Sequence, residues 1–480
     1  MNRLLKSIAL PGMALGIVLS PAFSAQGQQS GGAPQKPVLT QKEAPPAGGP
    51  PKAFVVPQKQ TFSLPNGIQV TMVPYGTLPK VSILATVRAG TLNESADQIW
   101  LADITTRLMK EGGTTTRSAE QVAQESASMG GQVSLNAGAD QTQAFADVLS
   151  EFGPKMAELL ADLLQHPLLP ESEFPRLKQD ALRRLAITRS QSQPLASEKF
   201  LKALYPDHPY GRSFPTEEMI AKFSVADARK FYNDNFGAAR THIYVAGKFD
   251  DAAMKKAITA AFSGWAKGPD PVINIPKPVA QRRLELVDRP NASQSTVYVG
   301  LPTIDPGNPD FLPLQVTNSL LGGSFGSRIT SNIREQKGYT YSPSSTLSAR
   351  YRTGYWAEIA DVTTAVTGPS LKEIFLEIDR LGKEPPDADE LKGIQDYLAG
   401  VFVLQNSSRL GIIGQLVFID LHNLGDKYLE TYVQRVYAVT PQQVKELTQK
   451  YLTPGRMTIV VVGDKSKISE QLTPYQAGAQ

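Results

Sequence analysis

Residues 224–231 read SVADARKF and lead into RTHIYVAG at residues 240–247, and this arrangement occurs twice in the chain. The second copy lies 216 residues further on, as TPQQVKEL at 440–447 and RMTIVVVG at 456–463. Each copy predicts a helix capped by Ser or Thr, then a loop, an arginine, a buried strand and a glycine. A repeat of this length indicates two duplicated domains and not a solenoid of short units.

A proline-rich segment separates the two copies. Pro269, Pro271, Pro276 and Pro278 fall close together in residues 264–278, which is a composition typical of a linker at a domain boundary. We therefore expect an α+β fold of two homologous, duplicated α/β-sandwich domains joined by this Pro-rich linker. The expected bounds are 57–265 for the first domain, 266–282 for the linker and 283–472 for the second domain.

Local patterns place several elements of the first domain. Asn66-Gly67 lies between alternating apolar and polar residues at 58–73, which predicts a hairpin. Ser118 with Gln121 three residues later predicts a capped helix start. Further strands are expected at 81–89, 133–137 and 241–246, and helical patterns at 101–109, 151–165, 171–191 and 215–235.

The N-terminus predicts export. Arg3 and Lys6 precede an apolar run at residues 8–19, and small residues follow, which is typical of a signal peptide at 1–25. Residues 26–56 are rich in Gln, Gly, Pro and Ala and predict a flexible leader. The chain contains no cysteine, which excludes a lipid anchor after the signal as well as thiol catalysis and disulfides. We expect an exported, periplasmic protein without a membrane anchor, and the formal net charge of +4 gives no reason to expect a nucleic-acid partner.

Several short motifs follow one another in a characteristic order. They are Leu64-Pro65-Asn66-Gly67 with Val70, Val87-Arg88-Ala89-Gly90 with Glu94, Leu101-Ala102, the segment from Tyr205 to Gly211, and the segment from Leu321 to Arg328. Taken together, they resemble the pitrilysin (insulinase) family of zinc metalloproteases. The likeness covers residues 58–470, which is nearly the whole chain after the leader, and it implies the duplicated fold expected above.

The resemblance also implies that the zinc site of this family is degenerate here. Active members carry H-x-x-E-H on a helix, in which two histidines bind zinc and the glutamate acts as the general base. In the register set by Leu101-Ala102, Asp103 and Arg107 stand at the two histidine positions and Thr106 at the glutamate position, while Arg184 stands where the third ligand is expected. Threonine is no base near neutral pH, and arginine repels a cation. We expect no metal on this chain, and we expect Arg107 or Arg184 to pair with Asp103; the alternative is that these three side chains are separately solvated.

A second motif of the family is better preserved. Arg334 to Tyr341 resembles R-E-K-R-G-L-A-Y, in which the Arg and the Tyr contact the substrate carbonyl. A guanidinium and a phenol hydroxyl can stabilise the negative charge that develops on that oxygen. Tyr339 occupies a position that is usually aliphatic, so either tyrosine is a candidate, and the spacing favours Tyr341. The plainer alternative is a surface arginine at a helix end and a half-buried tyrosine.

The glycine-rich stretch 322–327 predicts a tight turn between two helices, because it lacks the Lys-Ser/Thr of a phosphate-binding loop. The resemblance gives Gly322, Gly323 and Tyr339 a weaker candidate role in substrate binding.

The expected function is that of a non-zinc-binding subunit of a heterodimeric, exported zinc metallopeptidase. A catalytic H-x-x-E-H subunit of the same family would hold the zinc, and the two chains would enclose an unfolded peptide. This chain would supply Arg334 and Tyr341 to the partner's active site and would show no activity alone. The alternative is a scaffold or peptide-binding protein of the same fold with no catalytic contribution, and an active homodimer would require zinc ligands that the sequence lacks.

Overall fold

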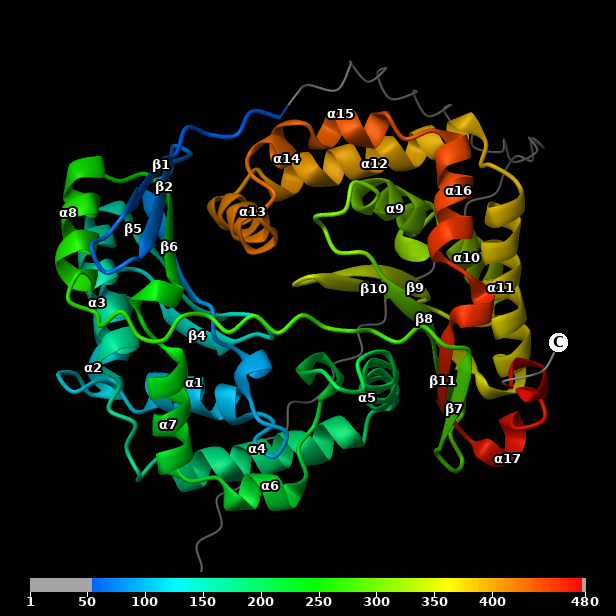
Figure 1. Ribbon diagram of the computed structural model, residues 1–480, viewed down its shortest axis with the longest axis horizontal. Helices are drawn as coiled ribbons and strands as arrows, with labels where there is room; N and C mark the ends of the chain where they lie inside the picture. Colours follow the sequence, from blue (N-terminus) through cyan, green and yellow to red (C-terminus); the bar gives the residue numbers. More distant parts are fainter. Residues whose placement is uncertain (1–53, 477–480) are drawn as a thin grey trace, which may run out of the picture. The chain divides into compact units, whose positions relative to one another are not determined.

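The computed structural model describes residues 54–476, which contain two mixed β-sheets (Figure 1). The signal peptide expected at 1–25 and the leader up to residue 53 lie outside the described residues. The six-stranded sheet has the order β1-β2-β6-β3-β5-β4, and the five-stranded sheet has the order β7-β11-β8-β10-β9. The strands of the first sheet are β1 (Gln60–Ser63), β2 (Gln69–Pro74), β3 (Lys80–Val87), β4 (Val133–Ala137), β5 (Thr142–Leu149) and β6 (Thr241–Gly247). Those of the second are β7 (Arg283–Asp288), β8 (Gln294–Thr303), β9 (Ser344–Arg350), β10 (Thr353–Thr363) and β11 (Thr458–Gly463).

The two sheets have the same topology once the extra edge strand β1 is set aside. In the first sheet β2 pairs parallel with β6, and in the second β7 pairs parallel with β11. All other pairs are antiparallel, and β4 and β9 are the edge strands at equivalent positions. The duplication expected from the repeated sequence is therefore confirmed by the pairing of the strands.

The repeated helix and strand occupy equivalent places. Helix α7 (Val225–Asn235) begins after Ser224, whose side chain accepts a hydrogen bond from the amide of Asp227. Helix α16 (Pro441–Tyr451) begins after Thr440, whose side chain accepts a hydrogen bond from the amide of Gln443. These caps satisfy amides that the first turn of a helix otherwise leaves unpaired.

Helices surround both sheets. Those of the first repeat are α1 (Leu101–Glu111), α2 (Ala119–Ser128), α3 (Gly153–Gln165), α4 (Phe174–Arg189), α5 (Ser192–Leu204), α6 (Glu217–Lys222), α7 (Val225–Asn235) and α8 (Asp251–Phe262). Those of the second are α9 (Phe311–Asn318), α10 (Arg328–Thr330), α11 (Thr367–Lys383), α12 (Ala388–Gln405), α13 (Arg409–His422), α14 (Lys427–Glu430), α15 (Tyr432–Tyr437), α16 (Pro441–Tyr451) and α17 (Lys465–Ile468).

Two helices at equivalent positions of the repeats are exchanged between the sheets (Figure 1). Helix α5 follows the first-repeat helix α4 but packs on β8 and β11 of the second sheet, where Phe200 is fully buried in one cluster with Ala357 and Val460. Helix α13 packs on β3 and β6 of the first sheet, and there the Tyr244 hydroxyl donates to the Asp420 carboxylate at 2.7 Å. Because each repeat covers the sheet of the other, the two are coupled through buried apolar surface.

The segment expected as a linker, residues 266–282, contains no helix or strand. Arg240, the arginine of the first sequence repeat, binds the start of this segment. Its buried side chain donates hydrogen bonds to the carbonyl oxygens of Pro269 at 2.8 Å and Asp270 at 2.7 Å. Farther along, the amide of Val279 donates to the carbonyl of Leu204 at 2.8 Å. Hydrogen bonds made by its backbone carbonyl and amide groups thus hold the segment against residues of the first repeat.

Most of the expected elements of the first repeat are present, and one is different. The hairpin around Asn66-Gly67 and the capping box of Ser118 and Gln121 are confirmed. The single helical pattern at 215–235 is wrong, because the chain is extended at Phe223 and Ser224, so that α6 ends and α7 starts there. Helices α5 and α8 and strand β5 were not expected.

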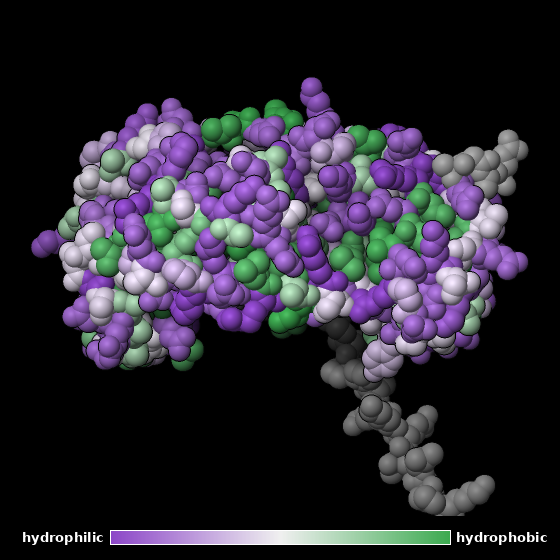
Figure 2. Space-filling view, turned by 90° about the horizontal axis from the view of Figure 1, so that it is seen from below, coloured by the Kyte–Doolittle hydropathy of each residue, from purple (hydrophilic) through white to green (hydrophobic). Residues whose placement is uncertain are grey.

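No helix between residues 54 and 476 combines the length and the apolar character needed to span a lipid bilayer. The face in Figure 2 is mostly hydrophilic, with apolar side chains in separate patches. Scattered exposed apolar side chains of this kind are ordinary on a protein surface.

Candidate functional site

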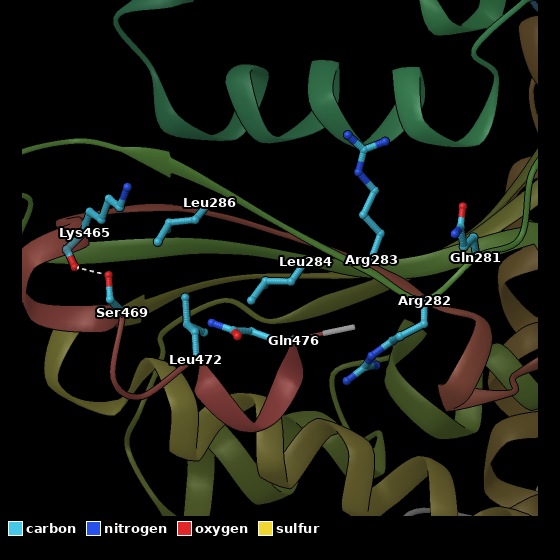
Figure 3. Close-up of a pocket in the computed structure, with 9 residues that line it drawn as sticks. All are labelled: Gln281, Arg282, Arg283, Leu284, Leu286, Lys465, Ser469, Leu472 and Gln476. Carbon is cyan, nitrogen blue, oxygen red and sulfur yellow. Dashed lines mark hydrogen bonds between the residues drawn. The ribbon is translucent and has the colours of Figure 1, made fainter. Parts of the chain in front are cut away.

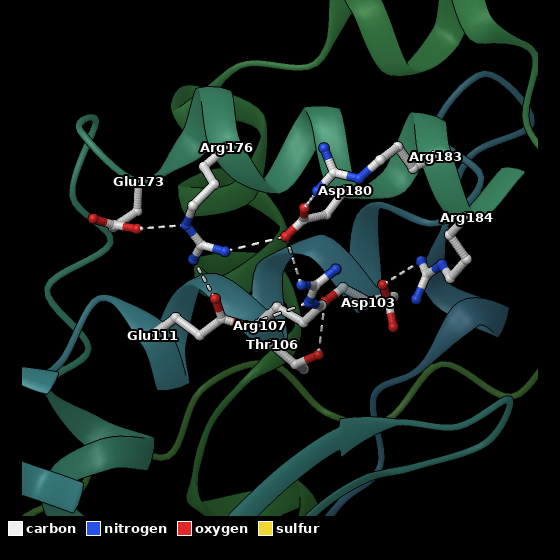
Figure 4. A network of polar contacts seen from close by, with 9 residues as sticks. All are labelled: Asp103, Thr106, Arg107, Glu111, Glu173, Arg176, Asp180, Arg183 and Arg184. Atoms are coloured by element: carbon white, nitrogen blue, oxygen red, sulfur yellow. Dashed lines mark hydrogen bonds and ion pairs between the residues drawn. The ribbon is translucent and has the colours of Figure 1, made fainter. Parts of the chain in front are cut away.

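Helices α1 and α4 bring together two of the positions aligned with the zinc ligands (Figure 4). The Arg184 guanidinium on α4 donates a hydrogen bond of 2.5 Å to the Asp103 carboxylate on α1. The same guanidinium lies 4.3 Å from the centre of the Trp100 ring, directly before α1. The ion pair between Arg184 and Asp103 that the sequence suggested is therefore present, with an aromatic ring beside it.

Arg107, at the second histidine position, belongs to a neighbouring ionic network. It contacts Glu111 one turn along α1 at 3.4 Å and Asp180 of α4 at 3.2 Å. Arg176 reaches the same two carboxylates, and Arg183 also pairs with Asp180 (Figure 4). Such alternating charges hold two helices together, although partly exposed pairs contribute only modestly to stability.

These side chains do not fit a zinc ion. Zinc is held by neutral imidazole, thiolate or carboxylate groups, and here Asp103 is paired with a guanidinium while the Thr106 hydroxyl donates to the Asp103 backbone carbonyl at 3.0 Å. Among residues 54–476, no group of three His, Cys, Asp or Glu side chains is arranged to hold a metal ion. The chemistry available at this place is that of an ion pair between two helices.

The second predicted pair lies in a different part of the chain. Arg334 is on a π-helical turn, Ser331–Gln336, that continues α10. Its guanidinium lies 4.4 Å from the centre of the Phe325 ring and 5.3 Å from that of Tyr341, and it contacts Glu335 at 3.2 Å. Tyr341 is 82% exposed and Phe325 73% exposed. The arginine is thus held beside two aromatic rings that solvent reaches.

The two candidate tyrosines differ in their surroundings. Tyr339 packs against the apolar core of the second repeat, and its backbone amide and carbonyl bond to Ile333 and Thr363. Tyr341 contacts the Arg334 guanidinium, and most of its side chain is open to solvent. Only Tyr341 therefore combines contact with Arg334 and access to a ligand.

The glycine-rich stretch forms the expected turn between two helical segments. A π-helical segment, Ser319–Gly323, continues α9, and α10 begins after Ser327. Gly322 is buried, and a Cβ atom there would lie 2.5 Å from the Glu358 carboxylate. At Gly323 a Cβ atom would lie 2.4 Å from the Asn318 side-chain nitrogen. Both glycines are thus required by close packing, and the exposed part of the turn is Phe325-Gly326.

Comparison with protein families decides the identity of the fold. Residues 74–216 match the model described as Insulinase (Peptidase family M16), and residues 222–398 match the one described as Peptidase M16 inactive domain. The chain belongs to the insulinase (M16) family. It is a peptidase-like, non-catalytic member of that family.

Relatives in the insulinase family match over most of their length. An uncharacterized zinc protease of Bacillus subtilis, YmxG, is 24% identical over 396 residues, which is 82% of this chain and 95% of that protein. One from Mycobacterium tuberculosis, Rv2782c, is 24% identical over 442 residues, covering 88% and 97%. Among solved structures, a peptidase M16 inactive domain from Pseudomonas fluorescens has a TM-score of 0.77 at 25% identity and covers 84% of this chain and 98% of its own. A protease from Helicobacter pylori has a TM-score of 0.79 at 19% identity, with 85% and 100% covered.

One buried acid of this insulinase-family chain was quoted in the sequence only as a landmark. Glu94 is 7% exposed, and its carboxylate accepts a hydrogen bond of 2.8 Å from the amide of Ala102 at the start of α1. Burial raises the pKa of the Glu94 carboxyl to about 8, against the lowering effect of the amides of Ala102 and Trp100. A carboxyl at the N-terminus of α1 fits the helix dipole and the unpaired amides there.

The sequence analysis also did not identify Phe325 as a site residue, although a large apolar residue inside a glycine-rich turn was a signal for it.

A third feature lies away from the predicted residues: a cavity of about 600 Å³ between β7 and the C-terminal segment (Figure 3). It is lined by Arg282, Arg283, Lys465, leucines and small polar residues, with no acid or histidine among them.

Proposed function

We propose that this chain is the non-zinc-binding subunit of a heterodimeric, exported zinc metallopeptidase. In this assembly a catalytic H-x-x-E-H subunit of the same family holds the zinc, and the two chains enclose an unfolded peptide. This chain supplies Arg334 and Tyr341 to the active site of the partner. The observation that carries the proposal is the contact between an Arg334 guanidinium and an exposed Tyr341 ring in a chain whose own metal position is filled.

The first support is the chemistry at the metal position. Arg184 pairs with Asp103, and Arg107 lies one turn further along α1. Two permanent positive charges repel a zinc ion, and Thr106 cannot take the proton of a water near neutral pH. Any zinc in the assembly must therefore come with the partner subunit, where it supplies a polarised water for peptide hydrolysis.

The second support is the arrangement around Arg334. The Phe325 and Tyr341 rings limit the directions that the guanidinium can take, while the side chain of Tyr341 stays open to a ligand. The tetrahedral intermediate of peptide hydrolysis carries negative charge on the former carbonyl oxygen. A guanidinium and a phenol hydroxyl fixed in advance stabilise that oxygen more in the transition state than in the substrate.

Peptide binding is supported by the edges of the sheets. Strands β4 and β9 each pair on one side only, which leaves backbone amide and carbonyl groups on the other side for an added strand. Extended peptides commonly bind proteins by such strand addition. An unfolded substrate can expose the backbone for this pairing, whereas a folded protein cannot.

Export is supported by the charged, apolar and small-residue pattern of residues 1–25. The periplasmic protease PqqL of Escherichia coli shares this fold, with a TM-score of 0.72 at 18% identity over 87% of this chain. We place the assembly in the periplasm because of the signal-peptide pattern, and not because of the shared fold.

The proposal is tested by producing the chain with an H-x-x-E-H subunit encoded beside its gene and by measuring peptide cleavage. We expect neither chain to cleave alone and the pair to cleave. Arg334→Ala and Tyr341→Phe should each lower kcat by about a hundredfold, because loss of one such donor costs about 3 kcal/mol. Arg456→Ala and Tyr397→Phe are the matched controls, since Arg456 is exposed and has no hydrogen-bond or ion-pair partner within residues 54–476, and Tyr397 is 49% exposed.

The same experiment distinguishes the alternative. If the pair is active but Arg334→Ala and Tyr341→Phe leave its kcat unchanged, the chain is a scaffold or peptide-binding protein. If the H-x-x-E-H subunit is fully active without this chain, the proposed assembly is wrong.

A further inference from the structure

Three arginines without partners meet where the two repeats touch. Arg88 follows β3, Arg350 ends β9, and Arg352 lies in the β9–β10 turn. None of the three guanidinium groups forms a hydrogen bond or an ion pair with any residue between 54 and 476. Apart from Arg435 and Arg456, every other arginine in that range has such a partner.

Aromatic rings hold these arginines together. The Tyr351 ring lies 4.7 Å from the Arg88 guanidinium and 5.5 Å from that of Arg352, so it stands beside both. The Arg350 guanidinium lies 4.7 Å from the Tyr210 ring and 5.4 Å from that of Tyr355. Stacking on aromatic rings fixes the plane of a guanidinium and leaves its N–H groups free to bind an anion.

The carboxylate of Asp140 lies in the arginine cluster and is already hydrogen-bonded to a tyrosine. The Asp140 carboxylate accepts a hydrogen bond of 2.7 Å from the Tyr210 hydroxyl. Burial raises its pKa, and the hydrogen bond from Tyr210 and the charges of Arg88 and Arg350 act against that rise. Since Asp140 carries at most one negative charge, the three arginines retain a net positive charge.

Arg350 shows the unmet demand most directly. Its Nε atom is buried and has no hydrogen-bond partner among the described residues. A buried donor left unpaired is costly, so Arg350 is held in place against an energetic penalty, while its terminal nitrogens stay accessible to a ligand. Arg352 is also held at an energetic cost, but in its backbone: its φ of 59° is in the left-handed region that glycine or asparagine adopts more easily.

A cavity opens beside the cluster. Its volume is about 400 Å³, and its lining includes Asp140, Ala349 next to Arg350, and His422 of α13. The β9–β10 hairpin reaches toward α13 at this place (Figure 1). Burial lowers the pKa of His422 to about 4; Asp305 opposes this and Arg88 and Arg352 add to it, so both arginines act on a side chain that lines the cavity.

We propose that Arg88, Arg350 and Arg352 form a carboxylate-binding site, which holds an acidic side chain or the C-terminal carboxylate of a bound peptide. Guanidinium groups bind carboxylates through two parallel hydrogen bonds, and the terminal nitrogens of Arg350, which are not buried, have no partner between residues 54 and 476. A peptide fits better than a nucleic acid because Arg350 ends the edge strand β9, to which a peptide backbone can add. This inference rests on the peptide-binding role proposed above.

The test measures binding of fluorescent peptides to the purified exported chain, without a catalytic partner. Three peptides of equal length are compared: one with two glutamates and an amidated end, one with glutamines and an amidated end, and one with glutamines and a free C-terminal carboxylate. We expect a carboxylate-bearing peptide to bind about tenfold more tightly than the neutral peptide, since a hydrogen bond to a charged group contributes about that much. Which of the two is preferred identifies the source of the carboxylate.

Variants locate the effect. The double variant Arg350→Gln/Arg352→Gln should bind all three peptides equally, and Arg88→Gln, which lies outside the hairpin, should reduce the preference as well. The control is Arg435→Gln/Arg456→Gln, which removes the two other arginines without partners and should keep the preference.

Equal binding of the three peptides by the unaltered chain, or no binding of any, would overturn the site. A preference that survives in the double variant, or tighter binding of an oligonucleotide that competes with the peptides, would overturn it too. The proposed function fails differently, because Arg334 and Tyr341 are tested by cleavage in the presence of the partner. If the chain shows a clear carboxylate preference but substitutions at Arg334 and Tyr341 leave cleavage unchanged, only the proposed catalytic role is contradicted and the carboxylate site stands.

Discussion

Arg184 of α4 donates a 2.5 Å hydrogen bond to Asp103 of α1. The resemblance described above places each of these two residues at a position where a zinc ligand is expected in active members of the insulinase family. In this chain an ion pair joins the two helices at that place. The cation–π contact of Arg184 with Trp100 adds a second interaction at the same place.

We expect this ion pair to stabilise the fold modestly. Asp103→Ala should lower the free energy of unfolding by about 1 kcal/mol, because both side chains are partly exposed and partly screened. Arg184→Ala should cost more than Asp103→Ala, since it also removes the stacking on Trp100. Urea unfolding of both variants and of the double variant measures the coupling, and strictly additive effects would show that the pair contributes nothing.

Gly322→Ala should be clearly destabilising. A Cβ atom there would lie 2.5 Å from the Glu358 carboxylate and 2.7 Å from the Ser345 hydroxyl, and both neighbours are buried. Overpacking of this kind costs about 1 to 3 kcal/mol. Gly326→Ala, in the same turn, is the control, because nothing lies within 4 Å of its Cβ position. Equal melting temperatures for the two variants would contradict the packing described here.

Glu94 should make stability depend on pH. Its pKa is raised to about 8 in the folded protein, above the ordinary value of 4.5, so the folded state holds the proton more tightly. As the pH rises from about 5 to 8, the unfolded state loses its proton first and the free energy of unfolding falls. Glu94→Gln does not titrate, so the unfolding free energy of the unaltered chain should fall relative to this variant by on the order of 3 kcal/mol across that window.

Chemical unfolding at several pH values checks this prediction. Glu470→Gln, at an exposed acid, should show the same pH dependence as the unaltered chain. A constant difference between the unaltered chain and Glu94→Gln from pH 5 to 8 would mean that Glu94 titrates normally.

The exchange of α5 and α13 predicts that the two repeats unfold together. Phe200→Ala removes a fully buried ring from the contact of α5 with the second sheet and should cost about 3 to 5 kcal/mol. Calorimetry should show one transition shifted to lower temperature. Leu404→Ala, at a side chain that is 72% exposed, should leave it unchanged. Two separate transitions, only one of them shifted, would show that the repeats are independent.

The repeat made much of this fold predictable. The caps at Ser224 and Thr440 and the strands that follow them are local features, and each could be placed from the residues themselves. The exchange of α5 and α13 could not, because an apolar helix face does not specify which of two similar sheets it will cover. Strand β5 was missed although its side chains alternate between buried and more exposed positions; Asp147, at one of the latter, pairs with Arg409, which is far away in the sequence, at the start of α13.

The candidate site was predictable to a similar extent. The motifs at Leu101-Ala102 and at residues 178–185 predicted that either Arg107 or Arg184 pairs with Asp103, and the structure shows that the partner is Arg184. The ring of Phe325 beside Arg334 depends on how a glycine turn folds back, which sequence does not specify. The cluster of Arg88 with Arg350 and Arg352 combines residues from both repeats and becomes visible only in three dimensions.

The zinc content of the purified chain tests the central claim most directly. After equilibration with one equivalent of zinc and removal of loosely bound metal, elemental analysis should find far less than one zinc per chain, and the chain alone should not cleave peptides. This expectation rests on the pairing of Arg184 with Asp103 and of Arg107 with Asp180 at the positions that the sequence motif aligns with the zinc ligands. One tightly held zinc per chain, together with peptide cleavage in the absence of any partner, would contradict the account.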